Sequence, residues 1–475
     1  MNIFFSLILI VVSSCGKSKE PQIIVTPVIP VVTPTGTNEV DFWLTTADKS
    51  SLLQKQNGIL NFDTKINSNS TILVDSTDIY QEMDGFGVTL TGGSTFVLNQ
   101  KLTAIERQNA LNDLFSSQGI GISYLRLSIG ASDMNATAYT YDDSQTADPE
   151  LLKFSIDMDK TDVIPVLKQI LAINPNIKLM SAPWSAPAWM KSNNDLVGGS
   201  LKPEYYAAYA KYFVKYIQAM QKEGIKIDAI TPQNEPENPN NNPSLVMTGA
   251  EQALFIKKHL GPAFKAAGLT TKIVIFDHNC DNPNYPISIL DDAEAKPFID
   301  GSAFHLYAGN INAMSQVKNK HPDKNIYFTE QYISSKGGFG GDLEWHTKNL
   351  IIGASRNYAK TVLEWNLATD ERFEPHTIGG CTECLGTITV INNSVIKNTA
   401  YYVLAHASKF VPVGSRRIAS NNIISVNNVA FLTPAGKKVL IAFNDSNQAQ
   451  TFNIKANNKQ VSVDLSKKAV GTFVW

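Results

Sequence analysis

The fold class is decided by the stretch Ile177-Lys178-Leu179-Met180-Ser181-Ala182-Pro183-Trp184 and by the two segments that follow it, Pro203 to Lys222 and Ile227 to Pro232. The first and third segments are short apolar runs, as buried β-strands are. The middle segment has the apolar spacing of an amphipathic helix, and Pro203 suits a first helical turn. Strand, helix and strand in this order are one unit of a parallel sheet.

The same alternation extends along the chain in both directions. A further clear helical segment runs from Glu251 to Ala267. Eight strand candidates share the apolar, β-type composition: Gly85 to Leu90, Ile122 to Ile129, Ile177 to Trp184, Ile227 to Pro232, Lys272 to Asp277, Ser302 to Tyr307, Asn325 to Thr329 and Thr361 to Asn366. Eight β-α alternations predict an α/β fold, a closed (β/α)8 barrel with its active site at the C-terminal ends of the strands.

The remaining segments predict a second, smaller unit and an extended leader. Short β-type runs before and after the barrel region are expected to form one β-sandwich from both ends of the chain. The predicted divisions are a signal peptide at 1–15, a tether rich in Pro, Thr and Val at 16–40, N-terminal sandwich strands at 41–80, the barrel at 81–398 and the C-terminal part of the sandwich at 399–475.

Charge and composition narrow the class of partner. The chain has 475 residues, 43% of them hydrophobic, and a formal net charge of -2. Without a global electrostatic field, the chain is not expected to bind nucleic acid. A neutral partner such as a sugar fits better.

The N-terminus predicts export. The apolar run Ile3 to Val12 is too short to span a bilayer but suits the core of a signal peptide. The motif Val12-Ser13-Ser14-Cys15-Gly16 resembles the lipobox of bacterial lipoproteins. This resemblance predicts that Cys15 is lipidated and that the protein contacts a membrane only through this lipid anchor. The expected location is the outer membrane, the cell surface or the periplasm. Since Met1-Asn2 lacks Lys or Arg, a signal peptide cleaved without lipidation is the alternative.

Polar and aromatic residues follow most of the predicted strands. A barrel places such strand ends around one mouth. Carboxylates together with Trp and Tyr are typical of glycoside hydrolysis, because aromatic faces hold the sugar while two acids supply a proton and a nucleophile. No phosphate-binding loop is present. The strand-end residues are Arg126, Trp184, Asn234, Glu235, His278, His305, Tyr307, Glu330 and Trp365.

Two glutamates stand out by position. Glu235 lies in Asn234-Glu235-Pro236 after the fourth predicted strand, and Glu330 lies in Thr329-Glu330 after the seventh. A glutamate taken alone is most often a solvated charge. Two that follow strands of one barrel are candidates for a catalytic pair.

At these residues the chain resembles glycoside hydrolase family 30, the family of glucosylceramidases and endo-β-1,6-glucanases. The resemblance covers nearly everything from Gln81 to Trp475. The motifs that carry it, in order, are Met83-Asp84-Gly85-Phe86-Gly87, Tyr124-Leu125-Arg126, Ser181-Ala182-Pro183-Trp184-Ser185-Ala186-Pro187-Ala188-Trp189-Met190-Lys191, the two glutamate motifs, Tyr401-Tyr402, and the run from Ser408 to Ile418.

The resemblance implies a retaining double displacement. Glu330 would attack the anomeric carbon, while Glu235 would protonate the departing oxygen and later activate water, with the two carboxyls about 5 to 5.5 Å apart. Asn234 would hold the sugar's 2-hydroxyl. Arg126 and Tyr307 would keep Glu330 ionised, whereas Glu235 would need a raised pKa.

The resemblance also assigns residues to the reacting sugar. Trp184 and Trp365 would be aromatic walls of its subsite, although core packing is the alternative for each. His305 matches the histidine that precedes the family's tyrosine by two positions, and it could equally bridge neighbouring strands. No cofactor or metal is implied, because two carboxylates and water suffice.

The pattern departs from glucosylceramidases at one place. Their first strand ends in Thr-Asp, whose aspartate holds distal hydroxyls, but Leu90-Thr91-Gly92-Gly93-Ser94 has no carboxylate. We expect this loss to leave room beside the sugar, which favours a β-1,6-glucanase over a glucosylceramidase-like β-glucosidase. A xylan-cleaving enzyme and a non-catalytic glycan-binding lipoprotein are remoter alternatives, and the oligomeric state is left open.

Three cysteines remain once Cys15 is set aside. Cys381 and Cys384 form a Cys-x-x-Cys motif without the second pair that a structural zinc site needs. In an exported protein this favours a local disulfide at the rim of the active site over two free thiols. Cys280 follows the fifth predicted strand and is expected either to line the cleft or to be a buried thiol.

Overall fold

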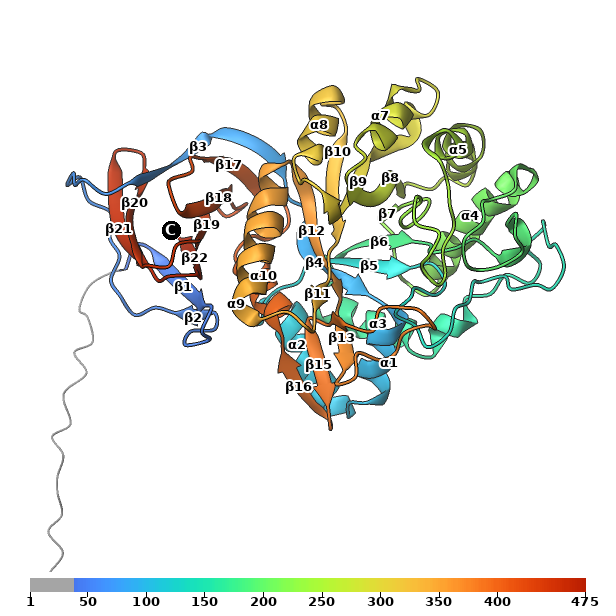
Figure 1. Ribbon diagram of the computed structural model, residues 1–475, viewed down its shortest axis with the longest axis horizontal. Helices are drawn as coiled ribbons and strands as arrows, with labels where there is room; N and C mark the ends of the chain where they lie inside the picture. Colours follow the sequence, from blue (N-terminus) through green and yellow to red (C-terminus); the bar gives the residue numbers. More distant parts are fainter. Residues whose placement is uncertain (1–37) are drawn as a thin grey trace, which may run out of the picture. The chain divides into compact units, whose positions relative to one another are not determined.

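Eight parallel strands close into a barrel (Figure 1). The computed structural model describes residues 38–475, so the predicted signal peptide, Cys15 and nearly all of the predicted tether lie outside the described residues. Neighbouring strands follow the order β10-β12-β4-β5-β6-β7-β8-β9. They are β4 Gly85–Leu90, β5 Tyr124–Ser128, β6 Lys178–Ala182, β7 Ala229–Ile230, β8 Lys272–Cys280, β9 Ile299–Gly309, β10 Asn325–Glu330 and β12 Ala359–Asn366. Each predicted strand is present, which confirms the α/β barrel.

Helices connect the barrel strands. The predicted helix at Pro203 begins with a short 3-10 turn before α4, and the predicted helix at Glu251 is a run of α5, a π turn over Ile256–Leu260, and α6. None of the helices formed by residues 38–475 is long and apolar enough to cross a bilayer. The α-helices are α1 Gly92–Gln100, α2 Ala104–Phe115, α3 Val163–Ile173, α4 Tyr206–Lys222, α5 Gly249–Phe255, α6 Gly261–Ala266, α7 Asn284–Asp291, α8 Ala313–Lys320, α9 Phe339–His346 and α10 Thr399–Ser408.

Side chains fill the barrel interior. Seven of its strands contribute buried apolar side chains to one interior cluster, and the interior is a packed core, as in other barrels of this kind. Strand β4 instead carries Gly87, where a Cβ would lie 1.7 Å from the carbonyl oxygen of Tyr124, so only glycine allows β4 to approach β5 this closely. The cluster consists of Tyr124, Met180, Ala229, Val274, Ala303, Tyr327 and Leu363.

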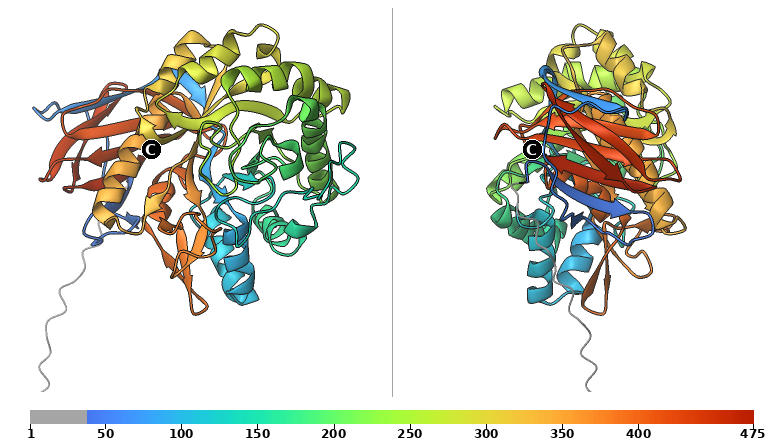
Figure 2. Two further views of the ribbon diagram at one scale, coloured as in Figure 1. Left: turned by 45° about the vertical axis from the view of Figure 1, so that its right-hand side comes forward. Right: turned by 90° about the vertical axis from the view of Figure 1, so that its left-hand side faces the viewer.

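Strands from both ends of the chain form a second sheet, as predicted (Figure 2). Its order is β2-β1-β22-β19-β18-β17-β3-β20-β21. The long β3 pairs with β17 on one side and with β20 on the other, and the sheet's apolar faces enclose their own core. The strands are β1 Asp41–Thr46, β2 Gln54–Lys55, β3 Thr71–Glu82, β17 Arg416–Ser420, β18 Val426–Leu432, β19 Lys438–Asn444, β20 Gln450–Ala456, β21 Lys459–Leu465 and β22 Ala469–Val474.

A buried histidine joins the barrel to this sandwich. His406 of α10 is 1% exposed and contacts Thr472 Oγ1 through Nδ1 at 2.9 Å and Thr45 Oγ1 through Nε2 at 2.8 Å. The Thr472 hydroxyl already donates to the carbonyl of His406, and Thr45 Oγ1 accepts from the Leu53 amide. Nδ1 is therefore the donor to Thr472, and in the neutral ring Nε2 accepts from the Thr45 hydroxyl. Burial lowers the pKa of His406 to about 3.

This histidine should make the stability depend on pH. Its pKa is lower in the folded chain than the ordinary value of 6.5, so its contribution is complete above pH 6.5 and is lost as the pH falls toward 3. Between pH 7 and 4.5 we expect His406 to lower the free energy of unfolding by about 2 to 3 kcal/mol. Urea unfolding of the wild type and of His406→Gln at both pH values measures this difference. An equally steep pH dependence in the variant would contradict the assignment.

Candidate active site

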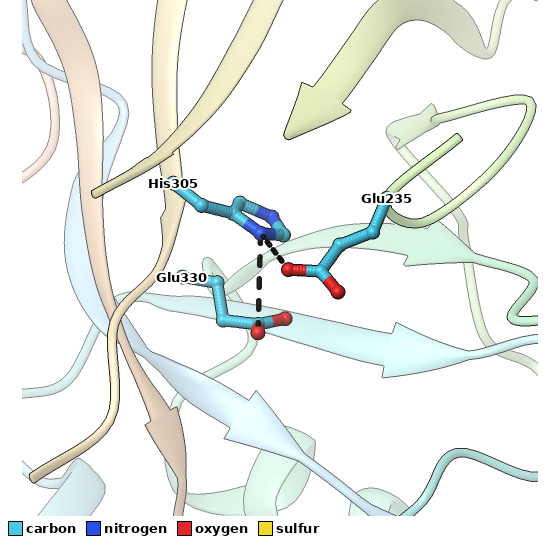
Figure 3. A group of neighbouring side chains, drawn as sticks. All are labelled: Glu235, His305 and Glu330. Atoms are coloured by element: carbon cyan, nitrogen blue, oxygen red, sulfur yellow. Dashed lines mark hydrogen bonds and ion pairs between the residues drawn. The ribbon is translucent and has the colours of Figure 1, made fainter. Parts of the chain in front are cut away.

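Glu235 and Glu330 face each other at the C-terminal end of the barrel (Figure 3). Glu330 is the last residue of β10, and Glu235 follows β7 in a segment without regular structure. Glu235 has a backbone φ of 46°, held by the bond from its amide to the carbonyl of Asp277 at 3.0 Å. Each glutamate is 6% exposed, and an oxygen of one lies within 4.8 Å of an oxygen of the other.

Arg126 of β5 connects the residues around Glu330. Its fully buried guanidinium donates through Nη1 to Glu330 Oε2 at 2.6 Å. Through Nη2 it donates to Asn234 Oδ1 at 2.6 Å and to Asp277 Oδ2 at 2.8 Å. Because Oδ1 of Asn234 accepts from the arginine, the amide group of Asn234 is left to donate to a ligand.

His305 of β9 lies between the two glutamates and Asp277. Its Nδ1 is 3.2 Å from Glu235 Oε1 and 3.9 Å from Glu330 Oε1, and its Nε2 is 3.1 Å from Asp277 Oδ1. Burial lowers the pKa of His305, but the negative charge of Glu330 and the bonds to Asp277 and Glu235 raise it to about 9. The ring therefore carries a positive charge near neutral pH. It contacts the site directly, in addition to bridging strands.

The order of the two glutamate pKa values is the reverse of the expected one. Burial raises the pKa of Glu235, but the hydrogen bond and charge of His305 lower it to about 2. Burial also raises the pKa of Glu330, and the charges of His305 and Arg126 do not fully offset this effect. The expectation of a raised pKa at Glu235 was wrong for the free protein, because the proton of this cluster resides on His305.

Aromatic side chains surround Glu330. Tyr307 donates from its hydroxyl to Glu330 Oε1 at 3.0 Å and is 36% exposed. Trp184 and Trp365 are only 1% and 4% exposed, and their ring centroids lie 5.5 Å apart. The guanidinium of Arg126 lies 4.8 Å from the Trp184 ring, in cation–π contact. Both tryptophans thus pack beside Arg126 in a buried cluster that also contains Cys384.

The predicted motif that contains Trp184 ends in a buried lysine. Lys191 is fully buried, and it donates to Ser185 Oγ at 2.8 Å and to the carbonyl of Ser244 at 2.6 Å. Burial lowers its pKa to about 7. Lys191 therefore ties the tryptophan loop to the loop that follows Glu235.

The sequence did not single out Asp277. Its carboxylate is fully buried and accepts from Arg126, His305, Thr231 and Thr329. These contacts lower its pKa below the ordinary range despite burial. Asp277 ends a predicted strand, so its position was available from the sequence, but its role depends on which strands are neighbours.

Asp133 is a buried carboxylate in a loop beside the end of the first barrel strand. The loop that carries Asp133 packs on Gly92 and Gly93, and a Cβ on Gly93 would lie 2.3 Å from the carbonyl oxygen of Met134. The residues next to Asp133 therefore pack directly against the start of α1, where the chain leaves β4. Asp133 is 7% exposed, and burial and the charges of Glu330 and Glu235 raise its pKa to about 7. This loop thus supplies a carboxylate that the end of β4 lacks.

Two asparagines that the sequence analysis did not select contact the second oxygen of Glu235. Asn238 and Asn241 donate to Glu235 Oε2 at 2.8 Å and 3.1 Å. With His305 on Oε1, the carboxylate of Glu235 is held on both oxygens. The side chain is therefore fixed before any ligand binds.

Within residues 38–475, one group of side chains lies close enough together to offer three ligands to a metal ion. It consists of Glu235, His305 and Glu330. The same three side chains are the proton donors and acceptors of the site. Neither sequence motif that contains the glutamates resembles a metal-binding motif.

Cys381 and Cys384 form a disulfide in the loop after β12. Strand β14 (Cys384–Leu385) pairs with β11 (Ile333–Ser334), which follows Glu330. Cys384 is 2% exposed and packs with Trp184 and Trp365, whereas Cys280 is a buried free thiol. The disulfide therefore packs against the two tryptophans.

The disulfide can be tested by mass. We expect the intact mass of the purified protein to increase by two hydrogens after reduction under denaturing conditions. Cys384→Ser should abolish the increase. An unchanged mass on reduction of the wild type would show two free thiols.

Comparison with known proteins identifies the family. The family model "Glycosyl hydrolase family 30 TIM-barrel domain" matches residues 83–411, and the family's β-sandwich domain matches residues 414–473. The chain is 34% identical over 393 residues to endo-1,6-beta-D-glucanase BGN16.3 of Trichoderma harzianum, covering 78% of this chain and 79% of that protein. It is 27% identical to the lysosomal acid glucosylceramidase of Mus musculus, covering 83% of this chain and 81% of that protein.

A solved structure agrees with these relatives. The endo-beta1,6-glucanase BT3312 is 35% identical and superposes with a TM-score of 0.85, covering 92% of this chain and 99% of that one. The barrel and the appended sandwich correspond to the family's two domain models. The chain belongs to glycosyl hydrolase family 30 and is a glycoside hydrolase.

Proposed function

We propose that this glycoside hydrolase is a retaining β-glucanase that cleaves β-1,6-linked glucan. The observation that carries the proposal is the short separation of the glutamates: one oxygen of Glu235 lies within 4.8 Å of one oxygen of Glu330. Inverting enzymes keep their carboxyls about 6.5 to 9.5 Å apart to admit a water molecule between them. The shorter separation favours direct attack by one carboxylate.

Glu330 is the proposed nucleophile. Its Oε2 accepts from Arg126 and its Oε1 from Tyr307, so both oxygens are oriented and the attacking form is the carboxylate. Attack forms a bond from a Glu330 oxygen to the anomeric carbon as the bond to the departing oxygen breaks. Glu235 gives that oxygen a proton, then removes one from the water that releases the sugar.

The proton for the first step comes from His305. In the free enzyme His305 holds the proton and Glu235 is ionised. Transfer across the 3.2 Å from Nδ1 to Glu235 Oε1 leaves a neutral imidazole that still donates from Nε2 to Asp277. Glu235 is then the acid that bond cleavage requires.

The reacting glucose would occupy the space beside the tryptophans. Trp184 and Trp365 form its wall, and the amide of Asn234 would donate to the 2-hydroxyl. Asp133 would accept from hydroxyls on the far side of the ring. A hydrogen bond to the 2-hydroxyl strengthens as the ring approaches its transition state.

The relatives favour β-1,6-glucan as the substrate. The Trichoderma harzianum protein and BT3312 are named for activity on this linkage, at 34% and 35% identity. A glucosylceramidase-like β-glucosidase is the second candidate. It is supported by the mouse relative and by Asp133, a buried carboxylate near Glu330 and Glu235 that could bind distal hydroxyls of a glucose unit.

We further propose that the enzyme is an exported lipoprotein anchored through Cys15. The support is the sequence alone: an apolar run of signal-peptide length followed by Ser13-Ser14-Cys15-Gly16. A tethered enzyme outside the cytoplasm would meet glucans. Metabolic labelling with a radioactive fatty acid should mark the wild type and not Cys15→Ala.

Product analysis tests the substrate. Purified enzyme is incubated with linear β-1,6-glucan, linear β-1,3-glucan and an aryl β-glucoside, with Glu330→Gln as the background control. We expect oligosaccharides from β-1,6-glucan only with the wild type. Glucose released from the aryl glucoside alone would establish the second candidate instead.

A further inference from the structure

A second aromatic surface lies beside the reaction centre. Tyr332 follows Glu330 by two residues, and its ring centroid lies 5.6 Å from that of Tyr307 with an interplanar angle of 37°. Both tyrosines are partly exposed, whereas Trp184 and Trp365 are buried. The tryptophans can enclose one sugar, and the tyrosines extend the aromatic surface outward from it.

We propose that Tyr332 is a specificity-determining residue that binds the glucose unit next to the one being transferred. This inference rests on the proposed function, since it requires a substrate of more than one sugar. A partly exposed aromatic face offers apolar contact to the carbon–hydrogen face of a sugar ring, and burial of that face stabilises the complex. Tyr307 donates a hydrogen bond to Glu330, so it marks the position of the reaction centre. The ring of Tyr332 adjoins that of Tyr307 and is therefore within reach of the glucose unit next to the reacting one.

The disulfide turn fixes Tyr332 in place. The Tyr332 hydroxyl donates to Glu383 Oε1 at 3.1 Å, and Glu383 lies between Cys381 and Cys384. The Glu383 carboxylate forms an ion pair with Lys336. A ring held by these contacts has little rotational freedom to lose when a sugar binds, so the contact contributes more to affinity.

Backbone contacts hold the turn itself. The amide of Ser335 donates to the carbonyl of Glu383 at 2.8 Å, and Ser334 pairs with Cys384. Upstream in the same loop, the amide of Thr377 donates to the carbonyl of Asp133 at 2.8 Å. One loop therefore positions both the proposed second platform and the carboxylate beside the first sugar.

Two substrates separate the contribution of Tyr332 from that of the catalytic residues. β-Glucosyl fluoride has one sugar and no further unit, so it does not reach Tyr332. A β-1,6-linked tetrasaccharide does. The measured quantity is the ratio of kcat/KM for the tetrasaccharide to kcat/KM for the fluoride.

Tyr332→Ala is expected to lower this ratio about tenfold or more, because it removes the apolar face of the ring. Tyr332→Phe keeps the ring and should change the ratio less than about threefold. If Tyr332→Ala does not fold, Tyr332→Leu keeps apolar bulk without an aromatic face and should still lower the ratio. Trp345→Ala, which removes an exposed ring from α9, is the matched control, with thermal unfolding measured for every variant.

The outcomes distinguish this inference from the proposed function. If the wild type cleaves the tetrasaccharide and Tyr332→Ala leaves the ratio unchanged, the inference about Tyr332 is overturned and the proposed function stands. A wild type that cleaves neither substrate overturns the proposed function and the inference with it. A lowered ratio that is restored in Tyr332→Phe supports both.

Discussion

Replacing Glu330 by Gln is expected to lower kcat on β-1,6-glucan by about 10⁴-fold or more, with the fold retained. The amide keeps the size of the side chain. Its oxygen can still accept from Arg126 and its NH2 group can donate to the Tyr307 hydroxyl, but it is not a nucleophile. The substitution also removes one negative charge from a buried cluster that contains Glu235 and Asp277. We therefore expect the thermal unfolding midpoint to stay the same or to rise. Initial rates of reducing-sugar release and differential scanning calorimetry measure the two effects.

A surface glutamate provides the control for this substitution. Glu150, paired with Lys211, has 73% of its side-chain surface exposed, and Glu150→Gln should leave kcat within about twofold of the wild type. If Glu330→Gln retained more than about a hundredth of the wild-type kcat, another group would have to form the bond to the anomeric carbon.

Arg126→Met should reduce both stability and activity. Its loss leaves Asp277, which is fully buried, and Glu330, which is nearly so, with His305 as their remaining positive neighbour, at a cost of about 3 to 5 kcal/mol in the free energy of unfolding. It also frees Asn234 and Glu330 to rotate, so kcat/KM is expected to fall about 10³-fold. Guanidinium unfolding and steady-state kinetics measure the two losses.

Arg126→Lys tests whether charge alone is sufficient. Lysine keeps the positive charge but cannot donate to Glu330, Asn234 and Asp277 in the planar fork of a guanidinium. It should recover part of the stability and less of the activity. Arg372→Met, at a site where 74% of the side-chain surface is exposed, is the control. An Arg126→Met variant as stable as the wild type would show that Asp277 and Glu330 do not depend on this charge.

The barrel could be predicted because its signals are local. Each strand is a short apolar run, and each helix has its own periodicity, so Ile177 to Trp184 predicts a strand without knowledge of its neighbours. Strand ends were less accurate: β7 is only Ala229–Ile230, and the segment from Thr231 to Glu235 is irregular. The backbone amides of this segment donate to residues at the ends of other strands and do not form a regular β-ladder. One example is the hydrogen bond from the amide of Glu235 to the carbonyl of Asp277.

The site could be predicted only in part, since its chemistry depends on neighbours in space. The motifs selected Glu235 and Glu330, but the sequence did not show that His305 contacts both glutamates and Asp277. That contact reversed the expected order of the glutamate pKa values. Asp133 lies in an irregular loop without periodicity, and its place near the glutamates depends on tertiary contacts such as the bond from the Thr377 amide to its carbonyl.

The most direct test of the central claim is the anomeric form of the first product released from linear β-1,6-glucan, followed by proton NMR before mutarotation. Double displacement with Glu330 as nucleophile predicts that the β-anomer appears first and that the α-anomer grows in later. Initial release of the α-anomer would contradict the account, as would failure of the wild type to release any reducing sugar from this glucan.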